Sequence, residues 1–252
     1  MMAKAETHYF TAPDGQLLAW HELGAGRPVL LLHGLFSNAE INWVRFGHAA
    51  ALAAAGLRVI MLDHRAHGQS AKPHDAAAYP KDVLTSDALA LAAHLELSDY
   101  DLVGYSLGAR TAVRMVKRGA RPRRLALAGM GLEGLLGTTG RADHFRDILT
   151  NLGKHERGSP QWMAEAFLKT SKGDPKALLP LLDSWEHVTQ ADLALVTMPT
   201  LVVAGAEDLD NGSAPHLAER LPDGRYAEVP GGHMSSVTKS ELGQAIAAFL
   251  RA

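Results

Sequence analysis

The sequence predicts an α/β fold, with a mostly parallel, doubly wound sheet, an N-terminal antiparallel hairpin and an inserted helical cap. Three observations support this prediction. Apolar, strand-like runs alternate with helical patterns, an Asp-Gly turn divides the N-terminal segment, and one long stretch holds helical patterns only. Alternating strands and helices are typical of parallel sheets that helices cover on both faces. The length of 252 residues is sufficient for one such domain with an insertion.

The first elements are expected to form the antiparallel hairpin. Asp14-Gly15 is a favoured hairpin turn, and strand-like segments flank it at residues 7–11 and 17–20. The next strand, at residues 29–32, is a continuous apolar run of the kind that is buried on both faces of a parallel sheet. Further strands are expected at residues 58–62, 101–103, 124–128, 201–204 and 225–229, and helices at residues 43–55, 82–95, 107–118, 214–221 and 240–251.

The alternation of strands and helices fails once, between Gly131 and Met198. Only helical patterns occur there, and glycines separate them. The helices are expected at residues 142–152, 160–169 and 175–185. We therefore expect a core domain that comprises residues 1–131 and 196–252, and an inserted helical cap that comprises residues 132–195.

Composition excludes several classes of protein. The 25 Lys and Arg against 27 Asp and Glu leave no basic surface for phosphates, so we expect no nucleic-acid partner. The absence of cysteine excludes disulfides, thiolate zinc sites and cysteine nucleophiles. No apolar stretch reaches the roughly 18 residues of a membrane span, and the start of the chain lacks the apolar region of a secretory signal. We expect a cytoplasmic protein without a membrane span, and the sequence leaves its oligomeric state open.

Polar residues gather where the predicted strands end. Ligands of parallel sheets bind outside the carboxyl ends of the strands, so these positions are the first candidates for a site. The segments that follow the strands are His33-Gly34-Leu35-Phe36, residues 63–70, Gly104-Tyr105-Ser106-Leu107-Gly108, residues 205–208 and Gly231-Gly232-His233. One edge of the sheet thus collects serine, aspartate and histidine.

Ser106 is the candidate nucleophile. It lies in a Gly-x-Ser-x-Gly pattern between a predicted strand and a predicted helix, as a nucleophile elbow requires. Gly104 and Gly108 would lack the Cβ atoms that clash in so tight a turn. The alternative interpretation is that Ser106 caps the N-terminus of the helix.

A serine hydroxyl needs an imidazole to accept its proton and a carboxylate to orient that imidazole. His233 is the candidate base because it follows the last strand, and Asp208 is the preferred acid because it follows the preceding strand. Asp210 in the same loop is the close alternative, and Glu133 is a remote one. The order serine, acid, histidine along the chain is that of a known triad arrangement.

No metal site is expected. Asp63, His64 and His67 share one loop, but no distant fourth ligand completes a metal-binding set. We interpret these three as structural loop residues. No cofactor is expected either, because the serine, histidine and aspartate suffice for hydrolysis.

At these residues the chain resembles the α/β-hydrolase superfamily, over nearly all of its length except the helical insertion. The pair His33-Gly34 looks like the family's oxyanion loop, and Ser106 sits in its nucleophile elbow. Gly232-His233 looks like its histidine loop. The sequence departs from the family pattern at Ala66 and Ala109, where glycine is usual. Three further segments carry the similarity: residues 63–70 (the Asp-x-Arg-Gly-x-Gly-x-Ser loop), residues 199–208 (the strand and loop of the acid) and His-Gly-Leu-Phe at residues 33–36, which is similar to small esterases.

The resemblance implies a carboxylesterase-like serine hydrolase with a short helical cap. The backbone N–H groups of Leu35 and Leu107 would hold the oxyanion. Phe36, Trp162 and Phe167 are candidates for the wall of an acyl pocket, although aromatic residues at helical spacing also serve to pack helices. Because seven basic and nine acidic residues are interspersed in residues 132–195, we expect the partners to be a small, neutral, modestly apolar ester and water.

Other functions remain compatible with the same residues. Hydrolysis of a carbon–carbon bond, a thioester or a lactone, acyl transfer and perhydrolysis all use similar triads. Haloalkane dehalogenases and epoxide hydrolases resemble this chain but carry aspartate where Ser106 stands, so we do not expect those reactions. A non-catalytic binding module on the same fold is the alternative of another class.

Overall fold

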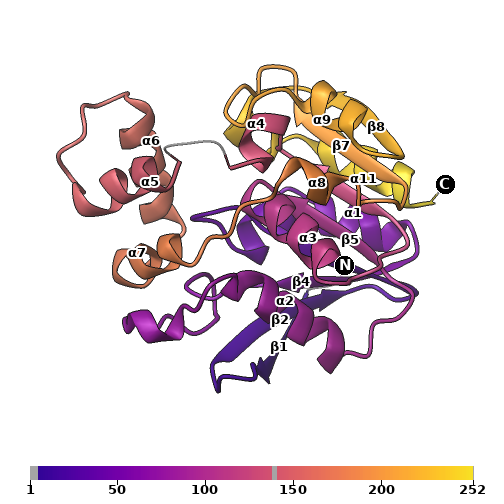
Figure 1. The fold of residues 1–252 in the computed structure, drawn as a ribbon, viewed down its shortest axis with the longest axis horizontal. Helices are drawn as coiled ribbons and strands as arrows, with labels where there is room; N and C mark the ends of the chain where they lie inside the picture. Colours follow the sequence, from indigo (N-terminus) through magenta and orange to yellow (C-terminus); the bar gives the residue numbers. More distant parts are fainter. Residues whose placement is uncertain (1–4, 138–140, 252) are drawn as a thin grey trace.

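An eight-stranded sheet lies at the centre of the molecule (Figure 1). The computed structural model describes residues 5–137 and 141–251. The strands run in the spatial order β1-β2-β4-β3-β5-β6-β7-β8. The β1–β2 hairpin is antiparallel, as predicted, β2 also pairs antiparallel with β4, and all other neighbours are parallel. Their bounds are β1 (Glu6–Thr11), β2 (Leu17–Leu23), β3 (Arg27–Leu32), β4 (Leu57–Leu62), β5 (Asp101–Tyr105), β6 (Leu125–Ala128), β7 (Thr200–Gly205) and β8 (Gly224–Val229).

Helices cover both faces of the sheet and enclose two apolar cores. One core lies under α2 (Val83–His94), α3 (Leu107–Lys117) and α9 (Ala214–Arg220), and the other lies under α1 (His48–Ala54) and α11 (Ser240–Arg251). Successive side chains of a strand point to opposite faces. Val29 and Leu31 of β3 therefore enter the second core, while Leu30 and Leu32 enter the first. This explains why β3 is a continuous apolar run, since both of its faces are buried.

The helix expected at residues 43–55 is divided in the structure, so its predicted continuity was wrong. A short π-helix, η1 (Glu40–Val44), ends before Gly47, and α1 begins at His48. The φ angle of Gly47 is 82°, a left-handed conformation that glycine adopts without a Cβ clash. A mid-sequence glycine thus ends one helix and starts another.

Five helices lie between β6 and β7 in the part of the chain that the structure describes. Ser159 and Asp174 cap α6 and α7 through their side-chain oxygens, and a proline follows each cap. The α7 helix ends at Asp183 rather than at residue 185, so Trp185 lies in the segment after it. The five are α4 (Leu132–Leu135), α5 (Arg141–Thr150), α6 (Pro160–Thr170), α7 (Pro175–Asp183) and α8 (Gln190–Leu193).

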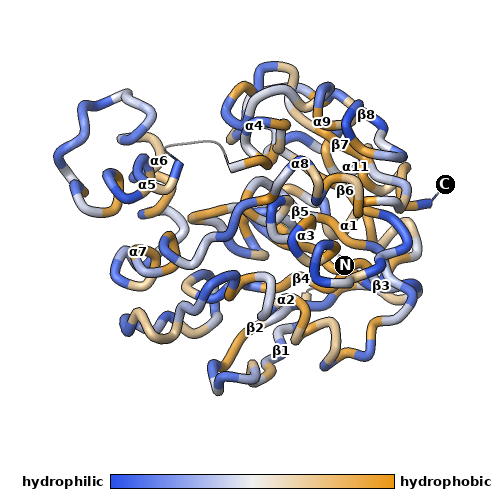
Figure 2. The backbone as a smooth tube through the Cα atoms, in the orientation of Figure 1, coloured by the Kyte–Doolittle hydropathy of each residue, from blue (hydrophilic) through white to orange (hydrophobic). Residues whose placement is uncertain are grey.

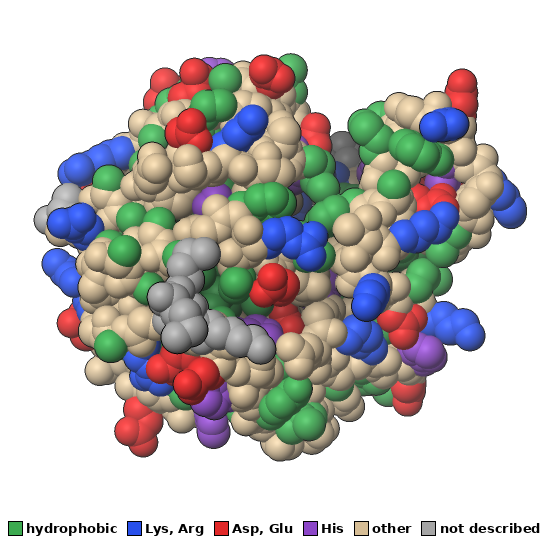
Figure 3. All heavy atoms as spheres, turned by 180° about the vertical axis from the view of Figure 1, so that it is seen from behind, with side chains coloured by type: hydrophobic (Ala, Val, Ile, Leu, Met, Phe, Trp, Pro, Cys, Tyr) green, Lys and Arg blue, Asp and Glu red, His purple; other side chains and the backbone are tan. Residues whose placement is uncertain are grey.

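The α5 and α6 helices form a lobe that projects from the body of the molecule (Figure 1). A third apolar cluster joins α5, α6 and α7 to the loops at one edge of the sheet, with Ile148, Leu178 and Phe36 among its buried members. Figure 2 shows hydrophilic segments on the outer side of the lobe and apolar segments in the sheet. Seen from behind, the lobe is separated from the body by a notch, and acidic and basic side chains are interspersed (Figure 3). None of the helices in the described ranges is long and apolar enough to cross a membrane.

Candidate active site

Ser106 lies at a strained turn between β5 and α3. Its φ is 53° and its ψ is −110°, a combination that costs a non-glycine residue energy and is typical of functional sites. Ser106 occupies the N-cap position of α3, but its side chain makes no capping hydrogen bond. A Cβ atom on Gly104 would lie 2.2 Å from the Gly108 oxygen, and one on Gly108 would lie 2.0 Å from the Leu32 oxygen. Both glycines are therefore required for the turn to close.

A chain of hydrogen bonds joins Ser106, His233 and Asp208. The Oγ of Ser106 lies 3.1 Å from Nε2 of His233, and Oδ2 of Asp208 lies 3.0 Å from Nδ1 of the same ring. Because a carboxylate only accepts, Nδ1 carries the proton that Asp208 binds, and Nε2 is left as the acceptor for the serine hydroxyl. His233 begins the short helix α10 (His233–Ser236), directly after the loop that follows β8.

The two alternative acids have other contacts. The backbone N–H of Asp210 donates to Oδ1 of Asp208 at 3.2 Å, so Asp210 helps to hold Asp208 in place. The Glu133 carboxylate accepts a hydrogen bond from the backbone N–H of Ser213 at 2.8 Å. Of the three acids considered, only Asp208 is hydrogen-bonded to His233 in the described residues.

The loop after β3 lies against Ser106. A Cβ on Gly34 would be 3.5 Å from the Ser106 Cβ, and Phe36 takes a positive φ of 60°. The Phe36 N–H donates to Nε2 of His67 at 3.3 Å, and the Gly34 N–H donates to the Asn42 side chain at 3.0 Å. Leu35 lies between Phe36 and Gly34, which lies against Ser106, and Leu107 follows Ser106 in the chain. The N–H groups of these two leucines have no acceptor in the described residues.

Three fully buried histidines support this loop. Nδ1 of His33 donates to the Gly34 carbonyl at 2.8 Å, and Nε2 of His33 accepts the His64 N–H at 3.0 Å. His67 donates from Nδ1 to the Arg65 carbonyl at 2.9 Å. Burial lowers the pKa of all three rings, and it lowers that of His67 to about 3. The rings are therefore neutral. The ring nitrogens of His33 and His67 bind backbone groups, whereas those of His64 have no partner in the described residues. The described residues include no cluster that could hold a metal ion.

Two residues near His233 carried no signal in the sequence. The Asn211 amide donates to the Gly129 carbonyl at 2.8 Å and lies 3.5 Å from Nδ1 of His233. The Tyr105 hydroxyl donates to the His233 carbonyl. Both contact residues that are distant in the sequence, and the elbow pattern leaves position 105 unspecified. Only the position of Tyr105, next to Ser106, could have drawn attention to it.

The residues expected to line an acyl pocket are separated in the structure. Phe36 is buried in the third cluster and contacts the Phe145 ring edge-on at 5.5 Å, and Phe145 contacts Trp185 at 6.2 Å. Phe167 packs against the same cluster. Trp162 is 37% exposed on α6 and is not a member of it. Ring contacts therefore connect Phe145 and Trp185 to Phe36, whereas Trp162 has no ring contact with these residues.

Comparisons with known proteins agree with this architecture. Residues 27–130 match the model of the family described as alpha/beta hydrolase fold. A relative from Pseudomonas putida, named as the dihydrolipoyllysine-residue acetyltransferase component of an acetoin cleaving system, is 32% identical over 94% of this chain and 67% of its own length.

Solved structures match over almost the whole chain. A hydrolase from Pseudomonas aeruginosa superposes with a TM-score of 0.79 at 22% identity, covering 98% of this chain and 99% of its own. A bromoperoxidase from Bacillus anthracis superposes with a TM-score of 0.76 at 23% identity, covering 97% of this chain and 100% of its own. At these identities the two likenesses concern the fold.

Proposed function

Because this chain belongs to the α/β-hydrolase superfamily, we propose that it is a serine hydrolase that cleaves a small carboxylic ester through an acyl-enzyme on Ser106. The observation that carries the proposal is the continuous hydrogen bonding from Ser106 through His233 to Asp208, at 3.1 and 3.0 Å. Strain at Ser106 adds support, since such a conformation persists only where the surrounding structure imposes it.

In the first half of the reaction, Oγ of Ser106 attacks the ester carbonyl carbon while its proton passes to Nε2 of His233. The carbonyl oxygen becomes negative and accepts hydrogen bonds from the N–H groups of Leu35 and Leu107. Asp208 holds the imidazole and stabilises its charged form. The intermediate then collapses: the ester C–O bond breaks, and His233 gives its proton to the leaving alcohol.

In the second half, a water molecule attacks the acyl-enzyme and loses a proton to His233. The bond between the acyl carbon and Ser106 breaks, the proton returns to the serine oxygen, and a carboxylic acid leaves. Atoms and charges balance without any cofactor.

Residues 132–195 act in this proposal as a cap over the core of residues 1–131 and 196–252. Phe145 of the cap contacts both Trp185 and Phe36, the residue after Leu35. The acyl part of the substrate would lie against this aromatic wall, with Phe167 behind it and Trp162 at the exposed rim.

The test is hydrolysis of p-nitrophenyl esters from acetate to decanoate by the wild type and by Ser106→Ala. We expect kcat to fall by about 10⁴-fold or more in the variant, with an unchanged melting temperature. Ser171→Ala, on the cap, removes a hydroxyl that donates to the Leu168 carbonyl; it is the matched control and should retain full activity. An organophosphate should label the wild type at Ser106. Turnover that survives in Ser106→Ala would contradict the proposal. Labelling of Ser106 without ester turnover would mean that the substrate is a thioester, a lactone or a compound with a cleavable carbon–carbon bond.

A further inference from the structure

Arg110 is a buried cation without a carboxylate partner. Three arginines are buried in the described part of the chain. Arg65 pairs with Asp87 at 2.8 Å, and Arg114 pairs with Asp82 at 2.8 Å. Arg110 is 8% exposed and forms no ion pair in the described residues; its guanidinium donates to a backbone carbonyl, that of Gly134. Burying an uncompensated charge is costly, so a chain that retains one at such a place needs a reason.

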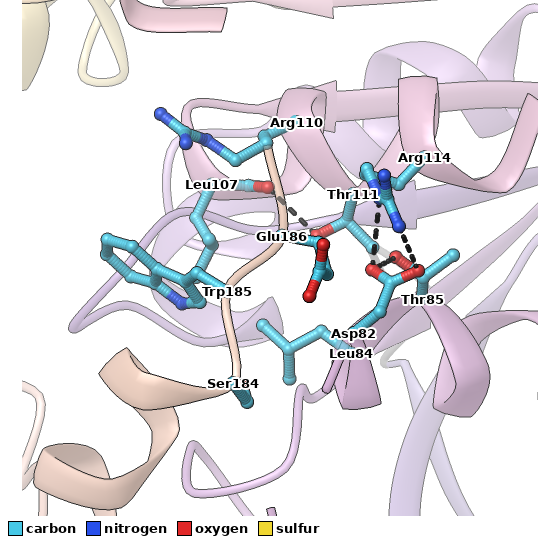
Figure 4. Close-up of a pocket in the computed structure, with 10 residues that line it drawn as sticks. All are labelled: Asp82, Leu84, Thr85, Leu107, Arg110, Thr111, Arg114, Ser184, Trp185 and Glu186. Carbon is cyan, nitrogen blue, oxygen red and sulfur yellow. Dashed lines mark hydrogen bonds and ion pairs between the residues drawn. The ribbon is translucent and has the colours of Figure 1, made fainter. Parts of the chain in front are cut away.

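Arg110 lies one helical turn after Ser106. Its N–H donates to the Ser106 carbonyl at 3.2 Å, so the two residues share the first turn of α3. Its guanidinium lies over the Trp185 ring, 5.8 Å from the centroid. Figure 4 shows the side chain extending toward Trp185 and away from the Asp82–Arg114 pair. The nearby cavity measures about 20 Å³ and has room for a single water. Leu107 and Trp185 also line it, as do the acids Asp82 and Glu186, but neither acid forms an ion pair with Arg110 in the described residues.

The Arg110 guanidinium is also connected to the candidate site from the other side. Gly134, whose carbonyl accepts from Arg110, donates its own N–H to the Asn211 carbonyl at 2.8 Å. The Asn211 amide lies 3.5 Å from His233. Arg110 therefore lies between the aromatic wall of Trp185 and the loop that carries the acid and contacts the histidine.

Arg141, the first residue of α5, is a second cation of this region. Its guanidinium lies 5.3 Å from the Phe145 ring centroid and donates to the Asp210 carbonyl at 2.7 Å, without forming an ion pair in the described residues. Burial, and after it the charge of Arg141, lowers the pKa of Arg110 to about 10. The two cations thus repel each other. Asp208 and Asp210 act electrostatically on Arg141, whereas no acid of the described ranges does so on Arg110.

We propose that Arg110, with Arg141 beside it, binds a carboxylate of the substrate, so that the preferred ester is anionic. This inference rests on the proposed hydrolysis at Ser106. One uncompensated positive charge matches one singly charged group, and the planar fork of a guanidinium fits a carboxylate with two parallel hydrogen bonds. The expectation of a neutral substrate came from charges averaged over residues 132–195; it did not consider Arg110, which lies outside that range.

The first experiment compares monomethyl esters of succinate, glutarate, adipate and pimelate with the methyl alkanoates of equal chain length. A second arm places the carboxylate in the alcohol, as in butyryl esters of glycolate and 3-hydroxypropionate. Acid release is followed at constant pH. We expect kcat/KM to favour the anionic ester at least tenfold in one arm, through a lower KM. No preference in either arm would overturn the inference.

Variants then assign the preference to Arg110. In Arg110→Gln the ratio of anionic to neutral kcat/KM should fall at least tenfold. Arg118→Gln makes the same charge change on the C-cap of α3, where the side chain is 40% exposed and pairs with Asp82, and should leave the ratio unchanged. If Arg110→Gln does not fold, Arg141→Gln serves in its place and should lower the ratio severalfold. An equal fall for both ester types would contradict binding of the carboxylate.

A binding measurement separates this inference from the proposed function. Calorimetry with Ser106→Ala and adipate needs no turnover, and the Kd should weaken at least tenfold when Arg110→Gln is added. Adipate binding without ester hydrolysis by the wild type would reject the proposed function and keep the anion site. Ester hydrolysis without adipate binding, and without a preference for anionic esters, would keep the proposed function and reject the anion site.

Discussion

The hydroxyl of Tyr105 donates a hydrogen bond to the backbone carbonyl of His233. Tyr105 precedes Ser106 in the chain, and the His233 ring accepts a hydrogen bond from Ser106. The same hydroxyl lies 3.2 Å from Oγ of Ser236, at the end of α10. Burial raises the pKa of Tyr105, which keeps the hydroxyl protonated and able to donate. The last strand residue before the elbow and the helix that begins with His233 are thereby fixed to each other.

Tyr105→Phe removes this hydrogen bond and keeps the ring. We expect kcat to fall about tenfold with little change in KM, because the His233 ring would be held less firmly, and the free energy of unfolding to fall by about 1–3 kcal/mol since the His233 carbonyl loses its buried donor. Tyr226→Phe is the control, because its hydroxyl is exposed and contacts only Glu228 at 3.4 Å. A loss of stability with unchanged kcat would show that Tyr105 supports the fold alone.

Asp208→Asn and Asp210→Asn decide between the two acids of the loop. Only Asp208 binds Nδ1 of His233, so the amide in its place should disfavour the required tautomer and lower kcat by about 10⁴-fold. Asp210 contacts Asp208 through its backbone N–H, which asparagine retains. Its substitution should therefore change kcat by less than about threefold. Steady-state kinetics on one ester measures both, and the reverse order of effects would assign the role to Asp210.

The sheet could be predicted from the sequence because its strands carry local signals. Residues 29–32 form an unbroken apolar run, and the structure buries Leu30 and Leu31 on opposite faces. Ser106 and His233 could be proposed as site residues because each follows a predicted strand, and parallel topology brings the segments after such strands together. The proximity of these two residues therefore follows from the parallel arrangement of the strands that precede them.

Other features depend on contacts that no local pattern encodes. Arg110 is one of several helical arginines in the sequence, and its lack of a carboxylate partner becomes visible only when the loop of Gly134 packs over it. Asn211 likewise becomes a candidate only because the structure places its amide 3.5 Å from Nδ1 of His233. Trp162 has the spacing of a core residue but lies at the surface, because the lobe of α5 and α6 packs with its other side inward.

Gly108→Ala tests the geometry of the elbow. Its Cβ would lie 2.0 Å from the carbonyl oxygen of Leu32, a backbone atom inside β3 that cannot move without disturbing the sheet. We expect the free energy of unfolding to fall by about 3 kcal/mol, measured by urea titration. Gly232→Ala is the matched control, since its Cβ would meet nothing closer than 3.5 Å. Equal effects of the two substitutions would mean that the close approach at Gly108 is not what requires glycine.

The buried histidines predict how stability depends on pH. Burial places the pKa of His33, His64 and His67 below the usual 6.5 in the folded state. The unfolded chain therefore binds more protons, and the stability that is complete above pH 6.5 is lost as pH falls, down to about 3 for His67. For His67 the slope in this window is about 1.4 kcal/mol per pH unit.

His64→Leu isolates one of these contributions. Both ring nitrogens of His64 lack a hydrogen-bond partner in the described residues, and its backbone N–H bond to His33 does not depend on the side chain. Leucine of similar volume should therefore cost less than about 1 kcal/mol at pH 8, and the loss of stability as pH falls below 6.5 should become less steep, because the pKa of His64 is lowered in the folded state. His94→Gln controls for the loss of an exposed imidazole. Denaturant titrations at a series of pH values measure both slopes, and an unchanged slope in His64→Leu would mean that this ring takes up its proton while the protein is folded.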